Sequence, residues 1–150
     1  MWNEIQTPED IEKLMSEYGG FHDSCIVSVS YESGAAVDNS GGMFDGSAEE
    51  HRVLMKLNSQ WCLPIELEFT GVRRCSIVGW QENYFCDISG AYLGFHTDLL
   101  GRTRDDLLIV WADSSSFDPS RNIDEKVIPL SGNGCTYVVA EGLRWRLLNE

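Results

Sequence analysis

The chain is poor in positive charge and lacks the motifs that identify many enzymes. It contains 11 Lys and Arg against 24 Asp and Glu, which gives a formal net charge of −13 over 150 residues. Nucleic acids and anionic membranes bind proteins through Lys and Arg, so we expect neither as a partner. The sequence has no glycine-rich phosphate loop, no G-x-G-x-x-G fingerprint and no G-x-S-x-G elbow. The acidic surplus suits a soluble protein or one with a basic partner.

Long apolar segments and paired cysteine motifs are also missing. No run approaches the roughly 20 apolar residues of a transmembrane helix. The first residues lack the basic and apolar regions of a secretory signal peptide, so we expect a cytoplasmic protein. Five cysteines without a C-x-x-C pair, and without histidines at zinc-ligand spacing, predict reduced thiols and no metal or cofactor. Most of these cysteines are expected to be small core side chains.

The length and an ordinary composition predict one folded domain over residues 1–150. One helix is expected near its start, because Thr7 is a favourable N-cap, Pro8 suits the first helical position and Gly19 suits the C-terminal end. Between them an apolar stripe follows the helical spacing, which predicts packing against a sheet: Ile11, Leu14, Met15 and Tyr18.

After the helix the apolar period changes to two, which is typical of strands. Gly71 is expected to end one strand, Gly142 to mark a bulge, and residues 107–112, apolar on both faces, to form a central strand. Glycine and polar residues predict a long loop over residues 33–49 and a tight turn at 131–134. The predicted strands are residues 25–32, 52–58, 65–70, 74–80, 84–95, 107–112, 126–130 and 135–148. Short connections favour an α+β fold: an N-terminal helix packed on a mainly antiparallel β-sheet or open β-sandwich of about eight strands.

Reactive side chains are densest between the helix and the first strand. His22 is a candidate base or metal ligand, Asp23 would orient it, and Cys25 is a candidate nucleophile. The alternative is that Asp23 and Ser24 form local turn hydrogen bonds while His22 caps the helix, which needs no further partner. Local turn chemistry is the favoured interpretation.

Two further groups have weak catalytic or metal-binding patterns. His96 could act with His22 and Asp23 in a small-molecule- or metal-dependent enzyme, although the spacings match no common ligand set. Glu66 and Glu68 lie on one strand face and could act as the paired carboxylates of a glycosidase. Cross-strand pairing of these two carboxylates with basic residues is favoured, and residues with the matching period are Arg52 and Lys56, or Arg144 and Arg146.

Aromatic residues offer a possible groove for a peptide or a sugar. Such side chains are more often core residues, but Trp80 precedes a turn-like stretch and is expected to be the most exposed among Trp80, Tyr84, Tyr92, Trp111 and Trp145.

Four short stretches together resemble a family of small uncharacterised bacterial proteins, mostly from gut-dwelling and soil Gram-positive species. These are FHDSCI at 21–26, IELEF at 65–69, ENY at 82–84 and LRWR at 143–146. No catalytic residue follows from the resemblance. Such small acidic cytoplasmic proteins also look like immunity proteins of bacterial toxin systems, by analogy of size and charge.

These observations favour a non-enzymatic acidic module that binds a basic protein, such as an immunity or inhibitor protein for a basic toxin. Acidic side chains would steer association and an aromatic side chain would anchor it. The candidate partner-binding residues are Asp45, Glu49, Glu50, Trp80, Asp105, Asp106 and Asp113. Two alternatives stay open: the enzyme that uses His22, Asp23 and His96, and a self-assembling structural module that forms a homo-oligomer through an exposed sheet edge.

Overall fold

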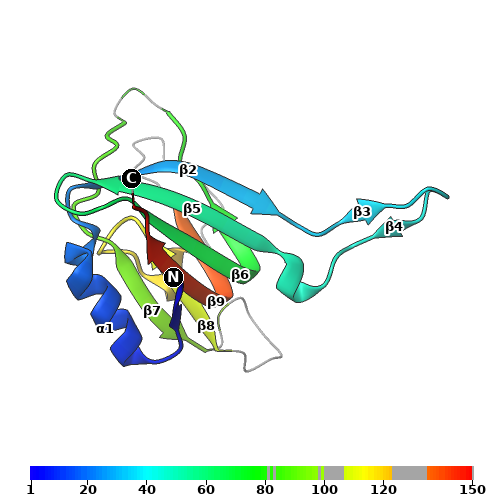
Figure 1. The fold of residues 1–150 in the computed structure, drawn as a ribbon, viewed down its shortest axis with the longest axis horizontal. Helices are drawn as coiled ribbons and strands as arrows, with labels where there is room; N and C mark the ends of the chain where they lie inside the picture. Colours follow the sequence, from blue (N-terminus) through cyan, green and yellow to red (C-terminus); the bar gives the residue numbers. More distant parts are fainter. Residues whose placement is uncertain (81, 83, 98, 100–106, 123–134, 150) are drawn as a thin grey trace.

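Figure 1 shows the fold in a computed structural model that describes residues 1–80, 82, 84–97, 99, 107–122 and 135–149. A ten-residue helix, α1, packs against a sheet in which all the described strand pairs are antiparallel. The α+β prediction is therefore confirmed, in its open-sheet form. The main elements are β1 (Asn3–Ile5), α1 (Pro8–Glu17), β2 (Ser24–Glu32), β5 (Arg52–Ser59), β6 (Ile65–Ser76), β7 (Tyr92–His96), β8 (Leu108–Ala112) and β9 (Tyr137–Leu147).

Seven strands form one sheet in the order β2-β5-β6-β9-β8-β7, and β1 pairs with β9. The long strand β9 pairs with β6 along one side. On its other side, β9 pairs with β8 through residues 137–140 and with β1 through residues 143–145. This arrangement leaves β2 and β7 as the two edge strands of the path, and the edge at β2 becomes important below.

The helix begins and ends where the sequence predicts. The Thr7 hydroxyl accepts a hydrogen bond from the Asp10 N–H, and the Asp10 carboxylate accepts one from the Thr7 N–H, which forms a capping box. The helix ends with Tyr18 as its C-cap, and Gly19 follows at φ +59°. The left-handed conformation at that position favours glycine.

The apolar side chains form one main core between α1 and the sheet. Leu14 and Tyr18 from the helix stripe are buried there. Strand β8 is buried on both faces, as predicted: Ile109 and Trp111 join the main core, whereas its other face packs in a second, smaller cluster. That cluster contains Leu108, Val110, Ala112, Phe117 and Val139.

Gly71 does not end a strand, so this prediction was wrong. Strand β6 runs through it to Ser76 and includes residues 74–76 of the separate strand expected at 74–80, whereas residues 77–80 are not in a strand. Gly71 adopts φ +63° inside the strand, and a Cβ there would lie 2.8 Å from side-chain atoms of Glu141. The register shift expected at Gly142 lies on the neighbouring strand instead, between Val72 and Arg74. Gly71 therefore allows β6 and β9 to approach each other closely and does not form a turn.

Replacing Gly71 with alanine should lower the free energy of unfolding by about 1–3 kcal/mol, because a Cβ meets both a left-handed backbone and a crowded neighbour. Gly79→Ala is the matched control, since a Cβ there has no atom within 4 Å. Urea unfolding of both variants measures the difference. Equal stability of the two variants would show that β6 tolerates a side chain at this position.

Two other segments differ from the prediction. Of the strand predicted at 84–95, only Tyr92–His96 forms β7, and Ile88 makes an isolated bridge to Ser24. The predicted loop at 33–49 contains a hairpin of β3 (Ala36–Val37) and β4 (Met43–Phe44), followed by a short 3₁₀ helix, η2 (Ala48–Glu50). Figure 1 shows this hairpin projecting away from the sheet. The strand predicted at 126–130 and the turn at 131–134 lie outside the described residues.

Candidate functional site

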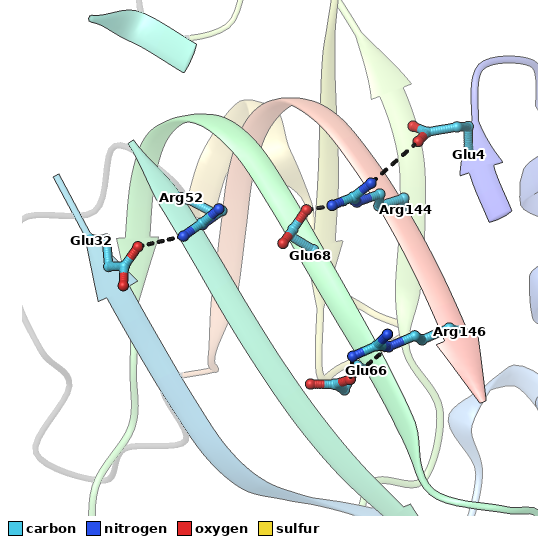
Figure 2. Close-up of polar contacts among 7 residues, drawn as sticks. All are labelled: Glu4, Glu32, Arg52, Glu66, Glu68, Arg144 and Arg146. Atoms are coloured by element: carbon cyan, nitrogen blue, oxygen red, sulfur yellow. Dashed lines mark hydrogen bonds and ion pairs between the residues drawn. The ribbon is translucent and has the colours of Figure 1, made fainter. Parts of the chain in front are cut away.

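One sheet face carries an ordered set of ion pairs, shown in Figure 2. Arg144 Nε lies 2.6 Å from Glu68 Oε1, and Arg146 Nη2 lies 2.8 Å from Glu66 Oε1. Both guanidinium groups also lie over the Trp2 ring, 4.5 and 4.4 Å from its centroid. The favoured interpretation of Glu66 and Glu68 as cross-strand partners of arginines is supported. Each carboxylate already has a cation, which leaves this pair unsuited to glycosidase chemistry.

Two other arginines of the described sheet are also paired with glutamates. Arg52 pairs with Glu32 on β2 at 2.5 Å, and Arg73 pairs with Glu141 on β9 at 2.7 Å. These arginines neutralise carboxylates of the sheet instead of forming a basic patch. The acidic surplus of the chain therefore lies on other surfaces.

His22 and Asp23 meet at the turn between α1 and β2. His22 Nδ1 lies 3.0 Å from Asp23 Oδ2, which also accepts a 2.8 Å hydrogen bond from Trp61 Nε1. The Ser24 hydroxyl donates to the Phe21 carbonyl oxygen at 2.5 Å. The Ser24 contact matches the local turn hydrogen bond predicted for that residue. Asp23 instead contacts the His22 ring, as expected of a residue that orients His22, and the distant Trp61. The His22 ring therefore pairs with Asp23 rather than capping the helix.

His22 and His96 have different partners in the structure, Asp23 and Tyr92. Ala91 N–H donates to the Gly20 carbonyl oxygen at 2.9 Å, which places the start of β7 beside the turn that carries His22. His96 lies five residues further along the strand, about 16 Å from Ala91 at 3.3 Å per residue. The His96 ring is hydrogen-bonded to the Tyr92 hydroxyl, and burial lowers the pKa of His96. Among the described residues, no group of three or more His, Cys, Asp and Glu side chains is placed to hold a metal ion.

A groove of about 490 Å³ lies along the β2 edge of the sheet and combines apolar side chains with carboxylates. We call it the acidic groove. Asp87 and Asp113 contribute the carboxylates, and none of the described residues that line it is Lys, Arg or His. Its lining comes from β2, from residues just after β6 and just after β8, from the segment before β7 and from residues just before β9: Ile26, Val27, Ser28, Val29, Ile77, Val78, Tyr84, Phe85, Cys86, Asp87, Ile88, Asp113, Ser114, Cys135 and Thr136.

A second cavity, of about 410 Å³, adjoins the acidic groove. Cys86 and Asp87 line both cavities. Asp23 lines only the second of the two cavities and adds a further carboxylate, and the part of this lining that the structure describes also has no basic residue. The two cavities therefore form one acidic region around residues 84–88. The remaining residues of the second lining are Ser24, Cys25, Asn58, Ser59 and Gln60.

Asp113 is the ionisable group that the groove perturbs most. Burial raises the pKa of its carboxyl from 3.8 to about 6, although a hydrogen bond from the Thr136 N–H to Oδ1, at 3.0 Å, opposes the shift. None of the cations that the structure describes is among the groups that shift this pKa. The carboxylate is therefore partly desolvated and lacks a compensating charge, which is the electrostatic state that a bound cation would relieve.

Asp113→Asn should stabilise the protein at neutral pH. Folding raises the pKa of Asp113 from 3.8 to about 6, so ionisation of this carboxyl lowers the free energy of unfolding. This loss of stability is absent below about pH 4 and fully present above pH 6. The full shift corresponds to about 3 kcal/mol, and solvent at this partly exposed group reduces the expected gain to about 1–2 kcal/mol at pH 7.5. Urea unfolding of both proteins between pH 4 and pH 8 measures it. A constant difference across that range would show that Asp113 does not titrate as described.

The structure separates the predicted partner-binding residues into two areas. Asp113 lines the acidic groove. Trp80 is 80% exposed, as predicted, and follows the groove residues 77–78 in the chain. Asp45, Glu49 and Glu50 lie instead on the chain that returns from the projecting hairpin, where Glu50 Oε1 accepts a hydrogen bond from the Ser47 N–H. Asp105 and Asp106 lie outside the described residues.

Several exposed residues in and near the groove were not predicted from the sequence. Phe85 is 81% exposed beside the groove, and Asp87 lines both cavities. Both lie in the segment that was predicted as a strand, where alternation places Phe85 on the same face as Asp87 and opposite Ile88. Trp61, the partner of Asp23, is also exposed. The shared face of Phe85 and Asp87 was the available indication that Phe85 is exposed.

The five cysteines form no disulfide, and none is fully buried. Cys62 and Cys75 pack against the main core, and Cys135 packs against the second cluster, as expected for small apolar side chains. Cys25 and Cys86 instead line the second cavity, and Cys86 is exposed. The prediction of core cysteines therefore fails for this pair.

A scan against protein-family models, a search of curated proteins and a search of solved structures each find no match to this chain. Within the described residues, no helix is long and apolar enough to cross a membrane.

Proposed function

We propose that this protein is a non-enzymatic module that binds a basic protein partner through the acidic groove. The observation that carries the proposal is the composition of the groove wall, where the described lining residues include apolar side chains and carboxylates but no basic residue. Exposed apolar surface next to unpaired carboxylates suits a partner segment that has both large apolar and cationic side chains.

The distribution of charge supports the same partner. Four arginines of the described sheet are paired with glutamates, namely Arg52, Arg73, Arg144 and Arg146, so these pairs add no net charge. Carboxylates of the groove and of α1 are left to dominate the field around the protein. A field of one sign accelerates association with an oppositely charged protein and disfavours like-charged ones.

An inhibitor of a basic toxin or nuclease, acting in the cytoplasm of a bacterium, is the form of this function that we favour. Carboxylates would cover the cations of the toxin active site, and Trp80 and Phe85 would supply the aromatic anchors that dominate many interfaces. Asp45, Glu49 and Glu50 lie away from the groove and would act through long-range steering. The five free thiols are compatible with a reducing compartment.

Affinity capture tests this function. Tagged protein is incubated with lysate of the source organism at about 0.05 M and about 0.5 M salt, and bound proteins are identified by mass spectrometry. We expect one basic protein at low salt and markedly less of it at high salt. The purified partner should then bind the double variant Asp87→Asn/Asp113→Asn at least tenfold more weakly, a loss of about 1.4 kcal/mol.

The control is the double variant Glu9→Gln/Glu12→Gln, which removes the same charge from the exposed face of α1. It should retain most of the affinity, because charges distant from an interface act mainly on the association rate. A partner that is acidic, that is insensitive to salt, or that loses equal affinity with both double variants would refute the proposal.

A further inference from the structure

Strand β2 has an outer edge that is only partly used. It is nine residues long and pairs with β5 on one side. On its other side, Ile88 N–H donates to the Ser24 carbonyl oxygen at 2.8 Å. Beyond Ser24, no backbone hydrogen bond from the described residues reaches this outer edge. The peptide groups of residues 27–32 on that side are therefore available to another strand.

The edge has few of the usual features that prevent pairing with another chain. Natural edge strands are commonly short, carry Lys or Pro, or contain a β-bulge. Strand β2 has neither residue type, and Glu32 at its end is its one charged residue. Val27 and Tyr31 are each 52% exposed on this strand. Its one irregularity is a register shift between Ile26 and Ser28.

The acidic groove follows this edge. Four consecutive residues of β2, from Ile26 to Val29, line it. Side chains of a strand alternate between two faces, so consecutive lining residues indicate a groove that runs along the edge rather than over one face. Ile77 and Phe85 contribute apolar side chains across from the edge, and Asp113 contributes the partly desolvated carboxylate.

We infer that the acidic groove binds an extended segment of the basic partner as an added strand on the outer edge of β2. Main-chain hydrogen bonds to residues 27–32 would hold the segment. Its side chains would alternate, with apolar ones packed against Ile77 and Phe85 and a Lys or Arg paired with Asp113. The inference rests on the proposed function and adds to it the conformation and side-chain pattern of the segment that binds.

Charge decides between a foreign strand and a second copy of this protein. A second β2 would bring Glu32 and a chain of net charge −13 to a groove that already contains Asp87 and Asp113. Like charges that face each other across an interface cost free energy, whereas a basic segment gains it. The edge therefore favours a basic segment from another protein.

A random dodecapeptide library displayed on phage provides the probe. The whole protein is the target, at pH 7.5 and about 0.1 M salt. Enriched peptides should contain alternating apolar residues and at least one Lys or Arg. Methylation of alternate backbone amides in a synthetic binder should weaken its dissociation constant at least tenfold, because those amides donate to β2. Methylation of the intervening amides should change it less than threefold.

Val27→Lys should weaken binding of the same peptide at least tenfold. Val37→Lys is the matched control, because Val37 is 62% exposed and lies on the projecting hairpin, outside the groove lining. Thermal unfolding of both variants verifies that they fold.

Three results would overturn the added-strand inference: no enriched peptide, equal effects of the two lysine variants, or indifference to the position of amide methylation. Light scattering that shows a dimer broken by Val27→Lys would assign the edge to a second copy instead. The outcomes also separate the two proposals. A basic partner that binds the Val27→Lys variant normally refutes the added strand and leaves the proposed function intact. Enriched peptides without basic residues retain the added strand and refute the preference for basic partners.

Discussion

Arg144→Ala is expected to lower the free energy of unfolding by about 1–3 kcal/mol, because it removes one partner from an ion pair whose carboxylate is mostly buried. Glu68 is only 8% exposed and would lose the guanidinium that now lies 2.6 Å away, although Arg52 would still attract it. The substitution also removes the cation that lies over the Trp2 ring. Urea unfolding at pH 7 measures the loss.

Arg52→Ala is the matched control for this prediction. Its partner Glu32 is exposed, so solvent hydrates the carboxylate after the arginine is removed, and the expected loss is below about 1 kcal/mol. The double variant Glu68→Gln/Arg144→Ala should recover part of the loss, since no unpaired charge remains buried. Similar losses for Arg144→Ala and Arg52→Ala would contradict the burial described for Glu68.

Phe21→Ala is expected to lower the free energy of unfolding by about 3–5 kcal/mol, as is usual for deleting a buried aromatic side chain. The ring is fully buried and contacts Tyr18 and Trp111, at centroid distances of 5.0 and 5.7 Å. Phe21 also adopts φ +64°, an unfavourable conformation for a non-glycine residue that packing of the ring maintains. Thermal and urea unfolding measure the effect.

The same substitution should disturb the acidic region, because the Phe21 carbonyl oxygen accepts the hydrogen bond from Ser24 at the start of β2. Phe44→Ala is the control, since Phe44 is 57% exposed on the projecting hairpin. A loss below about 0.5 kcal/mol is expected there, as for most surface substitutions. An equally small loss for Phe21→Ala would show that the Phe21 ring does not stabilise the turn.

Local chemistry made much of the fold predictable. The Thr7 cap, the apolar stripe and Gly19 each depend on neighbouring residues, so the helix could be located closely. Alternation located β2, β5 and the first half of β6, and a run that is apolar on both faces identified β8 as central. The pairing of Glu66 and Glu68 with arginines followed from the shared period of the two strands.

Tertiary contacts explain why other predictions were wrong. Gly71 resembles a strand terminator in sequence, but its missing side chain makes room for Glu141 of β9, a residue 70 positions away. The hairpin over residues 33–49 has strands of two residues each, too short for an alternating pattern. The segment containing Phe85 and Asp87 alternates like a strand, yet it forms a single bridge to Ser24 and leaves Phe85 exposed.

The candidate site was predictable only in part for the same reason. Asp113 and Trp80 were identified from their position beside predicted loops. Their relation to Val27 and Phe85 depends on the way the sheet brings the ends of β6, β8 and β9 to the β2 edge, which no local pattern records. The different partners of His22 and His96 likewise could not be predicted without the register of β7.

Hydrogen exchange of the protein with and without the captured basic partner tests the acidic groove as the binding site most directly. We expect amide exchange to slow at residues 26–32 and 84–88 in the complex, with α1 unchanged. Protection of residues 27–32 in particular would follow from a strand added to β2. Protection confined to the projecting hairpin or to the strands that carry the arginine–glutamate pairs, with unchanged exchange at 26–32 and 84–88, would contradict the assignment of the groove.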